Sequence, residues 1–205
     1  MVTRLLEILA GFIIYVISAL GLPGIVLLMA IESACIPLPS EVIMPFSGYL
    51  VFKGEYSLLA VSLAGAFGCV VGSVPAYYLG MYGGRPLIEK YGKYILMSHH
   101  DLDLADRWFQ RHGEWTVFIA RLLPVIRTFI AFPAGVAKMD MTRFIAYTFA
   151  GSFPWCLGLA YIGMVLGENW PTLRGYFHKF DVLIGLVLVA GIVWYVRRHL
   201  KQRVT

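Results

Sequence analysis

The segment from Phe118 to Thr128 reads FIARLLPVIRT and places two arginines and a proline inside an apolar run that extends from Trp115 to Ala137. A charge at the centre of a bilayer costs at least about 2.5–3.5 kcal/mol on insertion scales. Proline removes a helical backbone donor and clashes with the preceding turn. Broken backbone at membrane depth is stable only where protein or a wet cavity covers it. The segment therefore predicts a bent, re-entrant helical hairpin at 114–137 rather than a straight span.

A second interrupted segment lies near the N-terminus, from Ile25 to Phe52. It is apolar, but it contains two glutamates and three closely spaced prolines that cannot occupy one straight helix. We predict a first re-entrant hairpin at 24–56. A glycine follows the prolines of each hairpin, at Gly48 and Gly135. The residues expected to break the two hairpins are Pro37, Pro39, Pro45, Pro124, Pro133 and Gly135.

The rest of the chain supplies ordinary membrane segments. The 205 residues are 59% hydrophobic and 14% charged, whereas soluble domains are about 45–50% apolar and about 25% charged. The mean hydropathy of +0.73 agrees. The expected fold is an all-α integral membrane protein, one domain over 1–205, with about four transmembrane helices besides the two hairpins. The four segments of suitable length are Leu5–Gly21, Leu58–Gly80, Phe144–Leu166 and Val182–Val196.

The distribution of lysine and arginine predicts the topology. With both termini in the cytoplasm and both hairpins re-entrant, only Lys53, Arg174 and Lys179 lie outside, and only Arg121 and Arg127 lie within the membrane. All other basic residues are cytoplasmic, as the positive-inside rule requires. The hairpins then enter from opposite faces, which is the outline of an inverted repeat. Residues 85–113 are expected to include an amphipathic helix that begins at Ser98 in the cytoplasmic interface, and 197–205 form a basic cytoplasmic tail.

The net charge of +5 indicates contact with anionic membrane lipids, because the basic residues flank apolar blocks. No nucleic-acid partner is expected. We also expect no metal and no cofactor: the run SHHDLD at 98–103 is typical of a helix start, where acids complement the dipole. Asp140 and Arg143 are expected to cap and anchor a helix. The cysteines, Cys35, Cys69 and Cys156, are expected to be small core residues.

Four ionisable residues inside the interrupted segments form the candidate site: Glu32, Glu41, Arg121 and Arg127. The prolines between them allow bends that bring them into one chamber. Arginine stays charged when buried and binds oxyanions through its planar fork, so the arginines are candidate phosphate ligands. A carboxyl group removed from water can carry a proton, which makes the glutamates candidates for proton coupling or gating. A structural ion pair between the hairpins is the simpler alternative, and the two roles are compatible.

These motifs resemble those of the DedA family, also described as SNARE-associated or VTT-domain membrane proteins. The resemblance rests on Glu32 followed by Pro37-Leu-Pro39-Ser40-Glu41, and on Arg121-Leu-Leu-Pro124-Val-Ile-Arg127 followed by Ala134-Gly135. It implies two opposed re-entrant hairpins in the bacterial cytoplasmic (inner) membrane. It further implies a non-enzymatic transporter or flippase that returns a polyprenyl phosphate, undecaprenyl phosphate, to the cytoplasmic leaflet for cell-envelope recycling, with proton-motive force involved. The four ionisable residues are implied to be functional.

Other functions remain open from sequence alone. A lipid scramblase or a small-ion, proton-coupled transporter could use the same chamber. A membrane lipid phosphatase would need a nucleophilic histidine with partners, and none of the five histidines lies in an apolar span. A passive assembly protein would tolerate loss of either arginine. A homo-oligomer is compatible with the sequence, which does not set the oligomeric state.

Overall fold

The computed structural model describes residues 2–34, 36, 38–95, 107, 109, 113–123 and 126–167, and the regular structure within these ranges is entirely helical. This agrees with the predicted all-α class. The helices are α1 (Val2–Leu20), α2 (Leu22–Ser33), α3 (Ser40–Phe52), α4 (Leu58–Ile95), α6 (Trp115–Arg121), α7 (Ile126–Phe129), α8 (Ala131–Val136) and α9 (Met141–Val165).

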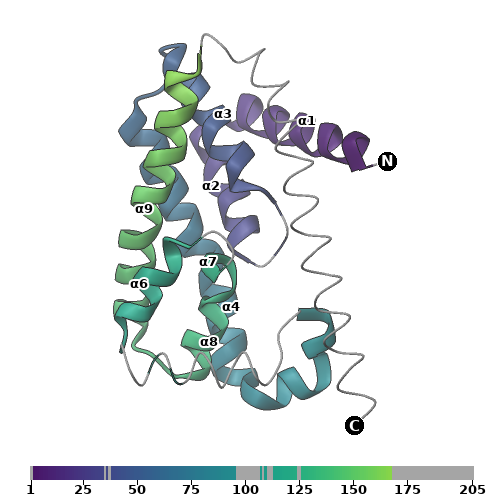
Figure 1. Ribbon diagram of the computed structural model, residues 1–205, viewed down its shortest axis with the longest axis vertical. Coiled ribbons are helices and arrows are strands. Elements are labelled where there is room, and N and C mark those ends of the chain that lie inside the picture. Colours follow the sequence, from purple (N-terminus) through teal and green to yellow (C-terminus); the bar gives the residue numbers. More distant parts are fainter. Residues whose placement is uncertain are drawn as a thin grey trace.

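Two long helices form the frame, and the short helices fill its two ends. In Figure 1, α4 and α9 run along the long axis, α2 and α3 occupy the upper half, and α6, α7 and α8 occupy the lower half. The last residues of α2 contact α7, so the two groups of short helices meet near the middle. With 12 and 13 residues, α2 and α3 are each about 18–20 Å long, shorter than the roughly 30 Å hydrocarbon core.

The two groups of short helices pack on the frame in the same way. The first member of each group packs on the long helix that follows it, α2 on α4 and α6 on α9, while α3 packs on α9 and α8 on α4. Glycines permit close approach: a Cβ added to Gly48 would lie 2.0 Å from the Ala160 carbonyl oxygen, and one added to Gly135 would lie 2.0 Å from that of Tyr77. Gly163 and Gly80 make the reciprocal contacts. Such small-residue contacts are typical of helix packing in membranes.

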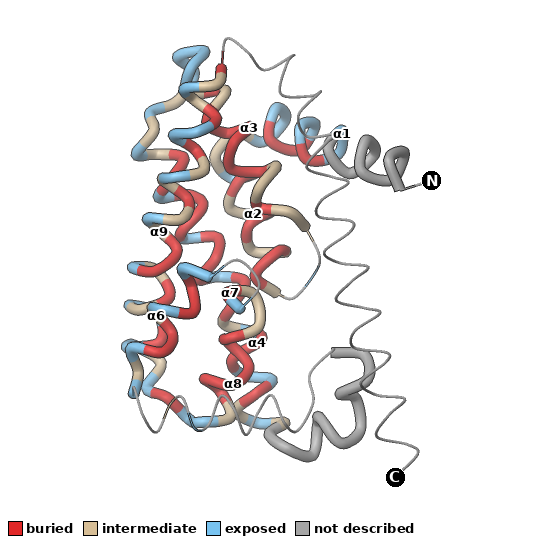
Figure 2. Tube along the Cα trace, viewed as in Figure 1, coloured by how far each residue is buried: buried red, intermediate tan, exposed pale blue. Residues whose placement is uncertain are grey.

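The distribution of exposed side chains fits a lipid environment. Within the described ranges, Leu58–Gly83 and Met141–Val165 are long and apolar enough to cross a membrane. Large apolar residues such as Phe67 and Leu79 on α4 are more than half exposed, whereas the guanidinium residues Arg121 and Arg127 are each 1% exposed. Figure 2 shows the buried residues concentrated between the helices and the exposed ones along their outer faces. A soluble protein shows the reverse arrangement.

Several boundaries differ from the sequence predictions. Helix α4 continues to Ile95, past the expected end at Gly80. Helix α1 covers the predicted segment from Leu5 to Leu20, but it contacts α2 and α3 and runs at a steep angle to α4 and α9 instead of parallel to them. The predicted span at Val182–Val196 and the tail at 197–205 fall outside the described residues, and of the predicted amphipathic helix beginning at Ser98 only Arg107, Phe109 and Gly113 are described.

The prolines do not all act as expected. Pro39 is the N-cap of α3, so the chain breaks there, and Pro133 lies in the first turn of α8, where backbone N–H groups have few intrahelical partners. Pro45 lies inside α3 and does not end it. The Pro45 carbonyl faces Gly163 of α9, so a neighbouring helix covers the turn that proline weakens. Pro37 and Pro124 lie outside the described residues.

Candidate functional site

A buried ion pair joins the two predicted hairpin segments, at α2 and α7. Arg127, the second residue of α7, donates from Nη2 to Oε2 of Glu32 in the last turn of α2, at 3.3 Å. The two side chains are 1% and 7% exposed. The negative C-terminal end of α2 also favours a cation at this position. The structure thus brings together two candidate site residues that are 95 positions apart in the chain.

The second arginine is held one helical turn further along α4. Arg121 ends α6 and donates from Nη2 to the Ser73 hydroxyl at 2.6 Å. Ser73 in turn donates to the carbonyl oxygen of Cys69, whose sulfur lies 3.6 Å from Arg127 Nη2. Because Cys69 and Ser73 are four residues apart, the two guanidinium groups contact neighbouring turns of the same helix. Both candidate phosphate ligands therefore lie in one buried cluster.

Helix α9 forms the opposite wall of this cluster. The Arg127 guanidinium lies 5.1 Å from the centre of the Trp155 ring, within the range of a cation–π contact. A Cβ added to Gly151 would lie 2.7 Å from Cβ of Arg121. Among the described residues, four buried polar atoms near this wall have no hydrogen-bond partner: Arg127 Nη1, Thr148 Oγ1, Ser152 Oγ and Trp155 Nε1.

The remaining candidate residues lie near the cluster or at its edge. Glu41, in the first turn of α3, accepts a hydrogen bond from Ser40 at 3.4 Å, and it lies within electrostatic range of Glu32 and Arg127. Asp140 caps α9 by accepting from the Arg143 backbone N–H at 3.0 Å. Arg143 also contacts Glu114 at 2.8 Å. The predicted capping role of Asp140 is therefore confirmed.

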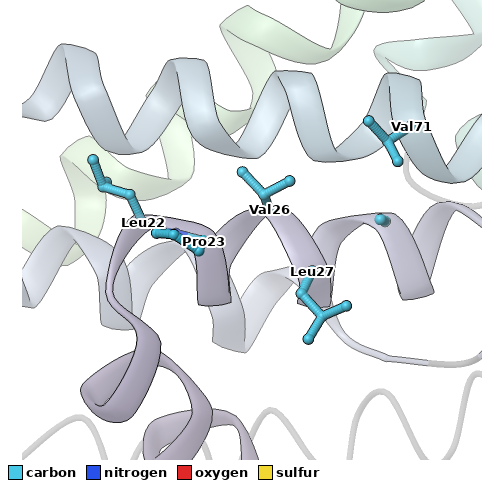
Figure 3. Close-up of a pocket in the computed structure, with 6 residues that line it drawn as sticks. Leu22, Pro23, Val26, Leu27 and Val71 are labelled. Carbon is cyan, nitrogen blue, oxygen red and sulfur yellow. The ribbon is translucent and has the colours of Figure 1, made fainter.

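An apolar groove lies on the outer side of the same region. It has a volume of about 510 Å³ between α2 and α4. Figure 3 shows Leu22, Val26 and Leu27 on one side and Val71 on the other. Ala30 also lines the groove, two residues before Glu32, and Val71 lies between Cys69 and Ser73 in sequence. The groove therefore runs along the two helices that carry Glu32, Cys69 and Ser73, on faces other than those that hold these side chains, because residues two apart in a helix do not face each other.

Sequence reasoning missed the polar residues that α4 and α9 contribute: Ser73, Thr148, Ser152 and Trp155. Each occurs singly in an apolar helix, where serine and threonine commonly bond to their own backbone and so indicate no site. No sequence pattern indicated that Gly151 lies against Arg121. No group of three potential metal-ligating side chains occurs within the described ranges. The chemistry available in this cluster is hydrogen bonding from buried cationic and neutral donors, which suits an oxyanion.

Comparisons with known proteins agree with the motifs. Residues 38–165 match the family model of the VTT domain. The chain is 38% identical over 182 residues to the uncharacterized membrane protein YkoX of Bacillus subtilis, covering 89% of this chain and 80% of that one. It is 34% identical over 179 residues to undecaprenyl phosphate transporter A of Bacillus subtilis, covering 87% and 88%.

A further relative is the alkaline phosphatase-like protein of Lactococcus lactis subsp. lactis, 31% identical over 196 residues with 91% and 92% of the two chains covered. No solved structure matches the chain. The family model covers more than half of the sequence and includes three of the four ionisable site residues, Glu41, Arg121 and Arg127. The chain therefore belongs to the VTT-domain family of membrane proteins, the DedA family that its arginine and proline motifs resemble.

Proposed function

We propose that this protein transports a polyprenyl phosphate lipid, of which undecaprenyl phosphate is the leading candidate, between the leaflets of the bacterial cytoplasmic membrane. The observation that carries the proposal is the buried pair of Arg127 and Glu32 at the meeting point of the two hairpin segments. A relative that is 34% identical over 179 residues bears the name undecaprenyl phosphate transporter A. An isolated structural ion pair would not account for the further unpartnered donors on α9 and on Arg127.

The two hairpins would provide access from both sides. If α2–α3 and α6–α8 each enter and leave on one face, their meeting point lies near the middle of the bilayer, where transporters with inverted repeats place their sites. The matching glycine contacts of α3 with α9 and of α8 with α4 support such a repeat. Small movements of either hairpin against the frame would open the cluster to one leaflet at a time.

Glu32 would control occupancy of the site by competing with the substrate. As a carboxylate it engages the Nη2 of Arg127. When Glu32 takes up a proton, this attraction is lost and the guanidinium can turn to a phosphate. When the proton leaves, the carboxylate displaces the phosphate and returns to Arg127. This exchange would couple proton movement to lipid movement, and Glu41, within electrostatic range of Glu32, would influence it.

The apolar groove between α2 and α4 would accommodate part of the polyprenyl chain. Its described lining contains only apolar side chains, and it runs along α2 and α4, the helices that carry Glu32 and Ser73. A lipid with its headgroup at Arg127 could therefore leave its hydrocarbon chain along the outer face of the protein. The polyprenyl chain is a hydrocarbon, so it would need no hydrogen-bond partner in the groove.

Reconstitution in vesicles tests this function. Labelled undecaprenyl phosphate is placed in one leaflet, and its transbilayer movement is followed for the wild-type protein, Arg121→Ala and Arg127→Lys. We expect transport to be lost in Arg121→Ala and strongly reduced in Arg127→Lys, because lysine cannot make a bidentate contact with phosphate. Ser62→Ala, a change at a buried serine that bonds only its own helix, is the matched control. Equal rates in all four proteins would reject the proposal.

The name of the Lactococcus relative raises a second candidate, hydrolysis of a lipid phosphate. The same vesicles distinguish the two functions through release of inorganic phosphate. Transport without phosphate release supports the flippase, while phosphate release that depends on Arg121 and Arg127 would favour the phosphatase. The five histidines that such an enzyme would draw on lie outside the described residues.

A further inference from the structure

Helix α9 carries two hydroxyl groups that behave differently from the other buried serines. Ser47, Ser62 and Ser73 each donate to the carbonyl oxygen four residues earlier in their own helix, as is usual for serine within an apolar helix. The hydroxyls of Thr148 and Ser152 do not: both are at most 1% exposed, and neither has a hydrogen-bond partner among the described residues. A buried hydroxyl without a partner costs free energy, so this arrangement requires a reason.

The positions of these residues on α9 direct them toward the arginines. Thr148, Gly151, Ser152 and Trp155 share one face of the helix, because residues three and four apart are neighbours. On that face Gly151 lies against Arg121, and Trp155 lies against the Arg127 guanidinium. Ser152 is between these two contacts. Its hydroxyl and that of Thr148 one turn earlier therefore lie on the face of α9 that contacts the two arginines, and both of these hydroxyls and Nη1 of Arg127 lack a hydrogen-bond partner among the described residues.

The packing register of the two long helices gives an independent reason. In α4, Gly68 lies against α2 and Gly80 against α8; in α9, Gly151 lies against α6 and Gly163 against α3. The two glycines are 12 positions apart in each helix. When the helices are aligned on them, Ser152 corresponds to Cys69, and Cys69 contacts Arg127. Ser152 thus occupies on α9 the position at which α4 contacts a buried site residue.

We propose that Thr148 and Ser152 donate hydrogen bonds to the terminal phosphate of the transported lipid and select phosphate monoesters over phosphodiesters. A monoester presents three terminal oxygens, whereas a diester presents two. The guanidinium fork can hold two oxygens, and the α9 hydroxyls would bind the third. This inference rests on the proposed function and adds to it the class of headgroup that the site accepts.

Binding to the purified full-length protein in detergent tests the inference, with four separate probes: undecaprenyl monophosphate, phosphatidic acid, phosphatidylglycerol and inorganic phosphate. Phosphatidic acid is a monoester lipid without a polyprenyl chain, and phosphatidylglycerol is a diester. The variants are Ser152→Ala, the double variant Thr148→Val with Ser152→Ala, and Ser62→Ala as the control. Thermal stability of each protein without lipid is measured in parallel.

We expect Ser152→Ala to bind undecaprenyl monophosphate about 10-fold more weakly than the wild type, and the double variant about 100-fold more weakly, as for lost hydrogen bonds to a charged group. Phosphatidylglycerol should bind weakly and equally to all proteins. Without lipid, the α9 variants should be as stable as the wild type or more stable, because each removes a buried polar group without a partner. Ser62→Ala should bind like the wild type.

The other outcomes separate the two proposals. Unchanged monoester binding in both α9 variants would overturn the role of the hydroxyls and leave the proposed function standing. Lower stability of the lipid-free α9 variants would also overturn it, because the hydroxyls would then be structural. Binding of phosphatidic acid but not of undecaprenyl monophosphate would reject the polyprenyl substrate, and the α9 variants would then decide the inference with phosphatidic acid. A wild-type protein that binds none of the four probes would reject both.

Discussion

Replacing Glu32 by leucine removes the carboxylate that Arg127 contacts at 3.3 Å, in a place where the two side chains are 7% and 1% exposed. Leaving one member of a buried ion pair unpaired costs about 3–5 kcal/mol. The contact is longer than the roughly 2.7–2.9 Å of a strong charge-assisted hydrogen bond, so we expect a loss near 3 kcal/mol. For a chain of this size, that corresponds to a fall in the unfolding midpoint of about 6–12 °C.

The reverse replacement, Arg127→Met, should cost less. It leaves Glu32 buried, but a carboxyl can take up a proton and become neutral, whereas a guanidinium cannot lose its charge. The double variant Glu32→Leu with Arg127→Met removes both charges and should be more stable than Glu32→Leu alone, as when apolar residues replace a buried pair.

The assay for this cycle is thermal unfolding of the purified protein in detergent, with all four proteins measured under one set of conditions. The losses in the two single variants should sum to clearly more than the loss in the double variant. Strictly additive losses would refute the reasoning, because they would mean that Glu32 and Arg127 do not interact in the folded protein.

Three further results are expected. Gly48→Leu and Gly135→Leu should strongly lower the yield and unfolding temperature of the protein, because an added Cβ would meet a backbone oxygen at 2.0 Å. Gly158→Ala should not, because nothing lies within 4 Å of a Cβ at that position. Equal stability of all three variants would contradict the packing described for α3 and α8. Ser73→Ala should lower transport, because Arg121 loses the hydroxyl that it contacts at 2.6 Å. Ser62→Ala is the control. Transport at the wild-type rate in Ser73→Ala would show that Ser73 does not position Arg121. Transport by the wild type should vary with external pH. Glu32→Gln should remove most of this variation, and Glu41→Gln should have a smaller effect. The same pH profile in all three proteins would exclude both carboxyl groups from proton coupling.

The sequence predicted the parts of the fold that depend on local chemistry. A proline at 39 cannot continue a helix from the preceding residues, and Pro39 does mark the start of α3. The charges at 32 and 127 are too costly in an apolar environment to be left apart, and they form a pair in the structure. Small residues are common where helices approach closely in membranes, and Gly72 and Gly80 of α4 make such contacts.

The rest depended on packing between distant segments. Pro45 sits within α3 because Gly163 of α9 lets the two backbones meet, and no local pattern links positions 45 and 163. Thr148 and Ser152 could not be assigned to the site because α9 is apolar on all sides, so its sequence does not indicate which face packs inward. To predict the contact of Arg121 with Ser73, one would also need to know which faces of α4 and α6 point toward each other.

The central claim is that the lipid phosphate binds at the buried arginines between the hairpins, and solid-state NMR can measure this directly. The protein is labelled with nitrogen-15 at arginine, reconstituted with undecaprenyl monophosphate, and examined for dipolar coupling between guanidinium nitrogen and lipid phosphorus. We predict a direct coupling that weakens in Arg127→Lys and disappears when Arg121→Lys is added. A coupling that persists unchanged in the double variant would place the phosphate at other arginines and contradict the account.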